Sequence, residues 1–93
     1  MRFAWDEAKN RANQAKHGVS FELATLVFDD RHALSLPDPH EGEERWRTMG
    51  LVQGVVLILV AHTTEEEDGD ELIRIISARK ATRHERKAYE ESH

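Results

Sequence analysis

The chain has no cysteine, two prolines and no hydrophobic run longer than the seven residues from Val55 to Ala61. Without thiols, neither a disulfide framework nor a thiolate metal site can form. Seven apolar residues are far fewer than the roughly 20 that a membrane-spanning helix needs. The N-terminus also lacks the basic start and apolar core of a signal peptide. These absences predict one small cytoplasmic domain over residues 1–93, with no membrane partner.

Charge is unevenly distributed along the chain. There are 18 acidic and 13 basic residues, which gives a formal net charge of −5. Six of the acidic residues lie between Glu65 and Glu71, and the rest of the chain has 13 basic and 12 acidic residues. The negative sign therefore comes from one segment, predicted to be an acidic loop, and it does not exclude RNA as a partner. The six histidines show no ligand spacing, so neither a metal nor a cofactor is predicted.

Capping residues and hydrophobic periodicity predict an α+β domain of order β-α-α-β-β-β-β-α, with helices packed on an antiparallel sheet. Asp6 and Ser20 are typical helix N-caps, and Gly18 is typical of a helix C-terminus. Thr82 and Glu85 have the spacing of a capping box. The predicted bounds are strands at Arg2–Trp5, His32–Leu36, Arg45–Val52, Val55–His62 and Leu72–Ala78, and helices at Asp6–His17, Ser20–Phe28 and Thr82–Glu91.

The same periodicity assigns faces to three of these elements. The apolar strand Val55–His62 is expected to be central and covered on both faces. The strand Arg45–Val52 is expected to carry Arg45 and Arg47 on one face and Trp46 on the other. In the first helix, three alanines are expected to face the core and three polar residues the solvent. These are Ala8, Ala12 and Ala15 on the inner side, and Lys9, Asn13 and Lys16 on the outer side.

Three segments resemble the BrnT toxins, whose fold is similar to that of RelE-type ribonucleases. They read FAWDEAKNRANQAKHGVSFELATLVFDD, EERWRTMG and IRIISARKATRHERKAYEE. The resemblance implies the toxin of a type II toxin–antitoxin system, an RNA endonuclease that inhibits translation, acting on RNA that is either free or on the ribosome. It also implies a ribbon-helix-helix BrnA-like antitoxin, a complex of two toxins and two antitoxins, and contact with operator DNA only through the antitoxin.

RNA cleavage needs cationic groups around the scissile phosphate and groups that move protons. Arginine suits the first task because its guanidinium matches phosphate oxygens and stays protonated. The candidate phosphate ligands are Arg45, Arg74 and Arg79. For each of them a structural role remains open, as a solvent-facing strand residue or in an ion pair; for Arg79 the predicted partner is Glu85. Metal ions are not needed in this scheme.

Proton transfer and RNA binding have their own candidates. His62 and Glu43 are candidates for proton transfer, with a structural histidine as the alternative for His62. The candidates for RNA binding are Lys9, Lys16, His17 and Tyr89. Lys16 and His17 are equally explained by the dipole at the end of their helix, and Tyr89 by packing onto the sheet.

One departure from the resemblance supports a second hypothesis. Relatives often carry a basic residue shortly after the His62-Thr63 dipeptide, whereas here Thr64 is followed by four acidic residues. An acidic patch beside the site repels phosphate. The alternative is therefore a catalytically weak or inactive module that binds the antitoxin as a corepressor of its own operon. A protein that binds DNA directly fits poorly, because no helix-turn-helix pattern is present.

Overall fold

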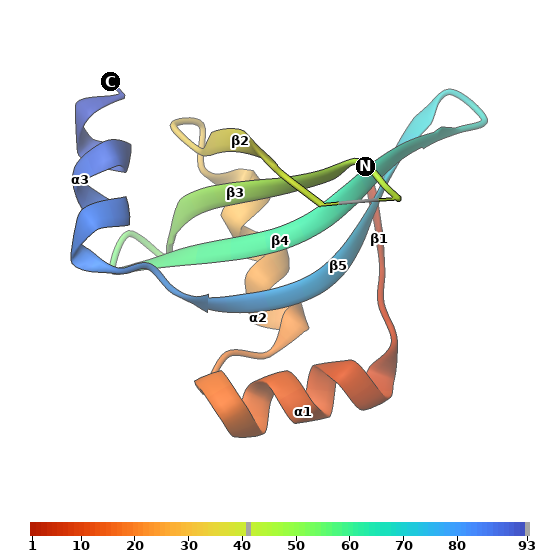
Figure 1. The fold of residues 1–93 in the computed structure, drawn as a ribbon, viewed down its shortest axis with the longest axis horizontal. Coiled ribbons are helices and arrows are strands. Elements are labelled where there is room, and N and C mark those ends of the chain that lie inside the picture. Colours follow the sequence, from red (N-terminus) through yellow and green to blue (C-terminus); the bar gives the residue numbers. More distant parts are fainter. Residues whose placement is uncertain (41, 93) are drawn as a thin grey trace.

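A five-stranded sheet forms the centre of the molecule, with helices on both of its faces (Figure 1). The structure is a computed structural model, and it describes residues 1–40 and 42–92. The strands lie in the order β1-β5-β4-β3-β2, so β4 is central, as its apolar sequence predicts. The elements are β1 Arg2–Ala4, α1 Glu7–His17, α2 Phe21–Ala24, the 3-10 helix η1 Thr25–Asp29, β2 Leu34–Asp38, β3 Arg45–Val52, β4 Val56–Glu67, β5 Asp70–Lys80 and α3 Arg83–Glu91.

The sheet is mixed, so the predicted all-antiparallel sheet is wrong in one place. β2, β3, β4 and β5 form an antiparallel meander, but β1 pairs with β5 in parallel. Phe3 lies opposite Ile73 in this pairing and joins the core on the side of α1. Residue alternation fixes which side chains share a face, but it carries no information on strand direction, and a three-residue strand leaves little other signal.

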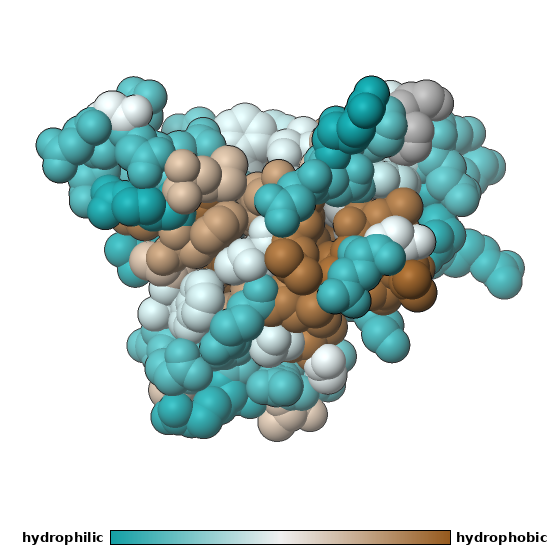
Figure 2. Space-filling view, turned by 180° about the vertical axis from the view of Figure 1, so that it is seen from behind, coloured by the Kyte–Doolittle hydropathy of each residue, from teal (hydrophilic) through white to brown (hydrophobic). Residues whose placement is uncertain are grey.

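The two helices α1 and α2, with η1, cover one face of the sheet, here called the helix face. Its core contains side chains that are fully buried, among them Phe21, Ile58 and Val60. Leu26 and Phe28 are only partly buried at its margin. Seen from behind, hydrophobic side chains gather in one patch between hydrophilic surfaces (Figure 2). The opposite face is covered at one end only, where α3 packs Tyr89 against Met49, Leu57 and Leu59.

The inner side of α1 is polar, which contradicts the predicted alanine face. Asn10 and Asn13 are its two buried residues. The Asn13 amide donates to the carbonyls of Val19 and Ala78 at 2.9 and 2.8 Å, and its oxygen accepts from the Ala78 N–H at 3.2 Å. The Asn10 oxygen accepts from the Phe21 N–H at 2.8 Å. These amides satisfy backbone groups that the helix would otherwise bury without partners, which alanine cannot do.

Three segment boundaries also differ from prediction. The second helix is α-helical only to Ala24 and continues as the 3-10 turn η1. β2 runs through Pro37 to Asp38, because an edge strand needs no N–H on its open side. The acidic segment is predicted to form a hairpin loop containing Asp68-Gly69; the hairpin is confirmed, but the loop is shorter than predicted because Glu65–Glu67 extend β4 and β5 begins at Asp70. The capping box at Thr82 is confirmed.

No helix within residues 1–40 and 42–92 is long and apolar enough to cross a membrane.

Replacing Asn13 with alanine should lower the free energy of unfolding by about 2–4 kcal/mol, because three buried backbone groups lose their partner. Urea denaturation measures this. Gln14→Ala, one residue further along the exposed side of α1, is the matched control and should change stability by less than about 0.5 kcal/mol. Equal effects of the two substitutions would contradict the structural role of the Asn13 amide.

Candidate functional site

A one-residue irregularity in β5 decides which arginines share a face. Ala61 of β4 pairs with Ser77, but the next residue, His62, pairs with Ile75, so Ile76 is the extra residue of a β-bulge. Arg74 and Arg79 are five positions apart, and strict alternation would place them on opposite faces. The bulge inverts the alternation, and both arginines lie on the face opposite α1 and α2.

The register places two further arginines of β3 on the same face, here called the arginine face. Trp46 pairs with His62, so Arg45, one residue before it, lies in the row of Thr63 and Arg74. Arg47 lies in the next row beside Ala61, and Arg79 lies opposite Leu59. Arg45 and Arg74 are separated by two interstrand spacings, about 10 Å between backbones, so both side chains can reach one anion above Thr63.

Three of the four arginines hold carboxylates of this chain. The Arg45 Nε donates to Glu43 at 2.5 Å, and the Arg47 Nε lies 3.5 Å from Asp38. Arg79 makes a bidentate pair with Glu85 at 2.8 and 2.9 Å. Arg74 is exposed, and its side chain has no ion pair or hydrogen bond to the described residues. Arg74 is therefore the arginine of this face that can take an anion without giving up a partner.

The pair of Arg79 and Glu85 joins the sheet to α3. The bidentate hydrogen bonds from Arg79 lower the pKa of Glu85 to about 2, against the opposing effect of burial. Glu85 also accepts from the Thr82 N–H as part of the capping box. The alternative of a structural ion pair, stated above for Arg79, is thus confirmed, and a phosphate must compete with Glu85 for this guanidinium.

His62 lies on the helix face and not with the arginines. The residue is 3% exposed, and its ring contacts Phe28 edge to face, with ring centroids 5.1 Å apart. Nε2 is 2.7 Å from the Thr48 hydroxyl, which in turn bonds to Ser35 at 2.8 Å. Burial lowers the pKa of His62, so the ring is neutral at neutral pH. The structure therefore supports a structural role for His62, the alternative to proton transfer.

Glu43 reaches the arginine face through Arg45, whose hydrogen bond lowers the pKa of Glu43. His40 and Lys9 make smaller electrostatic contributions in the same direction, and Lys9 is an exposed residue of α1. Lys16 and His17 are in the last turn of α1, on the helix face. The structure brings Glu43 to the arginines but not Lys16 or His17.

Tyr89 lies on the buried side of α3, and its hydroxyl donates a hydrogen bond to Asp30 at 2.5 Å. Burial, with a further contribution from Asp30, raises the pKa of Tyr89 to about 12. Burial by itself would raise the pKa of Asp30, but hydrogen bonds from Tyr89, from the Leu51 N–H and from the His32 N–H outweigh it and lower the pKa. Tyr89 therefore anchors α3, and its ring is not presented to a base.

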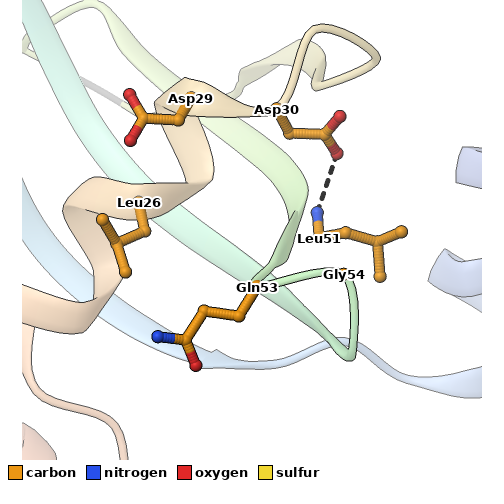
Figure 3. A pocket seen from close by; sticks show the side chains of 6 residues that line it. All are labelled: Leu26, Asp29, Asp30, Leu51, Gln53 and Gly54. Atoms are coloured by element: carbon orange, nitrogen blue, oxygen red, sulfur yellow. Dashed lines mark hydrogen bonds between the residues drawn. The ribbon is translucent and has the colours of Figure 1, made fainter.

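The Asp30 carboxylate borders a pocket of about 420 Å³ beside the β3–β4 turn. In Figure 3 Asp30 is turned toward the Leu51 N–H, while Asp29 points away from it. The residues lining the pocket are Leu26, Asp29, Asp30, Leu51, Gln53 and Gly54. Two carboxylates without a cation make this pocket unsuitable for a phosphate.

Three residues of the arginine face were not among the sequence-based candidates. Arg47 and His84 line a groove between β3 and α3, together with Leu36 and Glu85. Thr63 lies in the row of Arg45 and Arg74, and its hydroxyl is buried without a partner among the described residues. Alternation in β3 predicts that Arg47 shares a face with Arg45, but His84 and Thr63 join the site only through the packing of α3 and the bulge.

No group of three or more histidine, aspartate and glutamate side chains within the described part of the chain is arranged to hold a metal ion. The arginine face offers four guanidinium groups on adjacent rows of an open sheet surface. Three of them are paired with carboxylates, those of Glu43, Asp38 and Glu85, and the imidazole of His84 lies at the margin. The fold and this surface define a small α+β protein with arginine side chains gathered on the open face of its sheet.

Comparison with known proteins identifies the family. A model described as "Ribonuclease toxin, BrnT, of type II toxin-antitoxin system" matches residues 5–85. The chain therefore belongs to the BrnT family of ribonuclease toxins, and the resemblance noted in the sequence is confirmed. Membership of a type II toxin–antitoxin family implies an antitoxin as partner. Among curated proteins none matches.

A solved structure supports the fold. The chain is similar to the ribonuclease toxin BrnT of Brucella abortus, with a TM-score of 0.61 and 27% sequence identity. The similarity covers 89% of this chain and 99% of that one. The mixed α+β architecture is thus shared by the two proteins.

Stability should depend on pH through Glu85. Its pKa is lowered from 4.5 to about 2 in the folded protein, so the stabilisation is present above about pH 4.5 and is lost as the pH falls toward 2. Glu85→Gln keeps a capping-box residue but removes the charge. We expect the free energy of unfolding of the wild type to exceed that of this variant by about 1–2 kcal/mol at pH 6. The difference is this small because Arg79 is about a third exposed, and solvent screens the ion pair.

The difference between wild type and Glu85→Gln should shrink toward zero near pH 2 in urea denaturation measured at several pH values. A difference that stays constant from pH 6 to pH 2 would contradict the ion pair between Arg79 and Glu85.

Proposed function

We propose that this protein is a metal-independent RNA endonuclease that inhibits translation, and that it binds the scissile phosphate on the arginine face. The observation that carries the proposal is the bulge at Ile76, which aligns Arg74 with Arg45 across β4. A guanidinium pair on either side of one phosphate neutralises the charge that develops on the phosphorane. Membership of a ribonuclease toxin family supports the same reading.

The reaction proceeds by attack of the 2′-hydroxyl oxygen on the adjacent phosphorus. The 2′-hydroxyl gives up its proton to a base, the new 2′-O–P bond forms, and the P–O5′ bond breaks. The 5′-oxygen leaves with a proton from an acid, so the products are a 2′,3′-cyclic phosphate and a 5′-hydroxyl. Glu43 beside Arg45 is the candidate base, and His84 beside Arg47 is the candidate acid.

Arg74→Ala and Arg45→Ala should each lower the rate of RNA cleavage by about 10²-fold or more, because each removes charge stabilisation of the transition state. The assay uses purified protein, a labelled oligoribonucleotide and excess EDTA, with cleavage products identified by their cyclic-phosphate ends. Arg11→Ala, which removes an exposed arginine of α1 on the helix face, is the control and should cleave at the wild-type rate.

If Arg45→Ala and Arg74→Ala both cleave at the wild-type rate, the arginine face is not the site. If EDTA abolishes cleavage by the wild type, the metal-independent scheme is wrong. Inducing the wild type in bacteria should stop growth and degrade transcripts, and the Arg74→Ala variant should not.

The partner that we propose is a BrnA-like ribbon-helix-helix antitoxin, in a cytoplasmic complex of two toxins and two antitoxins. Operator DNA is contacted only by the antitoxin in this arrangement, and kinship of the fold with RelE-type ribonucleases is part of the same proposal. Co-expression with a neighbouring ribbon-helix-helix reading frame should yield a stable complex, and the mass of that complex measures the stoichiometry.

The second candidate function is a corepressor with weak or no nuclease activity. Glu65 favours it, because this exposed carboxylate lies on the arginine face two residues from Thr63. A negative charge at that position opposes the approach of phosphate. Glu65→Gln should raise RNA cleavage if the nuclease proposal holds. Soluble wild-type protein that leaves RNA intact while its antitoxin complex binds operator DNA would favour the corepressor.

A further inference from the structure

The hydroxyl of Thr63 is the buried side-chain oxygen without a hydrogen-bond partner among the described residues. The residue is 9% exposed and lies in the central strand β4. A buried hydroxyl with no partner has lost its bonds to water and gained none in return, which disfavours the folded state. Valine has nearly the same shape and avoids this cost, so the hydroxyl does not serve stability.

The position of Thr63 indicates what the hydroxyl serves. Thr63 pairs with Arg74 on one side, and alternation from the pair of Trp46 and His62 puts Arg45 on the other. One pair of residues, His62 and Ile75, separates the bulge at Ile76 from this row. A phosphate held by both guanidinium groups therefore lies above the Thr63 side chain.

We propose that the Thr63 hydroxyl donates a hydrogen bond to a non-bridging oxygen of the phosphate bound between Arg45 and Arg74. This deepens the proposed function and rests on it for the identity of the ligand, a phosphodiester of RNA. The hydroxyl is covered in the free protein, so binding requires a neighbouring side chain to move. Arg74 is free to do so, and Arg45 is held by an exposed carboxylate, Glu43.

Thr63 makes a different contribution from the arginines. The guanidinium groups end long, flexible side chains, whereas the Thr63 hydroxyl is one bond from the Cβ of a β-branched residue in a central strand and has few positions available. It sets the height and register of the phosphate on the sheet, which aligns the 2′-oxygen with the base. Loss of the hydroxyl thus weakens binding without changing the number of charges that RNA neutralises.

The experiment compares Thr63→Val and Thr63→Ser with the wild type in binding a 2′-O-methyl oligoribonucleotide, which cannot be cleaved, by fluorescence anisotropy. Thr63→Val should bind about 10-fold more weakly or worse, and Thr63→Ser should stay within about threefold of the wild type. The slope of log affinity against log salt should be unchanged in Thr63→Val, but reduced by about one in Arg74→Ala.

Urea denaturation supplies the structural control. The urea concentration at the unfolding midpoint should be equal or higher in Thr63→Val than in the wild type, because valine leaves no hydroxyl unpaired. Thr48→Val removes a hydroxyl that is satisfied by Ser35 and His62 on the helix face. It should lower the midpoint and leave oligonucleotide affinity unchanged. A lowered midpoint in Thr63→Val would mean that its hydroxyl is already satisfied in the free protein, for example by a buried water, and would overturn the inference.

The outcomes separate this inference from the proposed function. Wild-type affinity in Thr63→Val overturns the role of the hydroxyl and leaves the nuclease proposal intact. Weak binding by Thr63→Val, together with a wild type that binds but cleaves no 2′-hydroxyl RNA, supports the phosphate contact and rejects the nuclease. A wild type that binds no oligonucleotide overturns both.

Discussion

A β-bulge of one residue, Ile76, is the constraint on which the rest of the site depends. Alternation along β5 is strict on each side of it: Ala78 faces α1 on one side, and Ile75 and Ile73 face the same core on the other. The inserted residue lets the strand bury its isoleucines and still turn Arg74 outward. Without it, either Arg74 would enter the core or the isoleucines would leave it, and both cost far more than the bulge.

Carboxylates of the same chain form ion pairs with most of the arginine face. Arg45, Arg47 and Arg79 each have an acidic partner, so the free protein does not expose four unpaired guanidinium groups in a row. In the proposed function, RNA phosphate replaces these carboxylates. The pair with Glu85 is bidentate and joins the sheet to α3, so in the proposed function a phosphate at Arg79 would compete with the contact that holds α3.

The helix face supports this surface through buried polar contacts as well as apolar packing. Asn13 fastens α1 to the backbone of β5 at Ala78, two residues beyond the bulge. On the far side of the sheet, Asp30 accepts from the N–H of Leu51 in β3 and from the hydroxyl of Tyr89 in α3. Both contacts lie outside the rows around Thr63: one holds α1 to β5, and the other holds Asp30 to β3 and α3.

The sequence by itself determined the elements that local chemistry specifies. Asp6, Ser20 and Thr82 begin their helices because their side chains satisfy free N–H groups within three residues, and the apolar run of β4 could only be central. The resemblance of three sequence segments to BrnT toxins also identified the family, which the family model confirms. The tertiary structure alone decided the parallel pairing of β1, the inward turn of Asn13, the placement of His62 away from the arginines, and the entry of Thr63 and His84 into the site. Each of these depends on a partner distant in the chain, or on the extra residue of a bulge, which periodicity cannot reveal because a shift of one position exchanges the two faces of a strand.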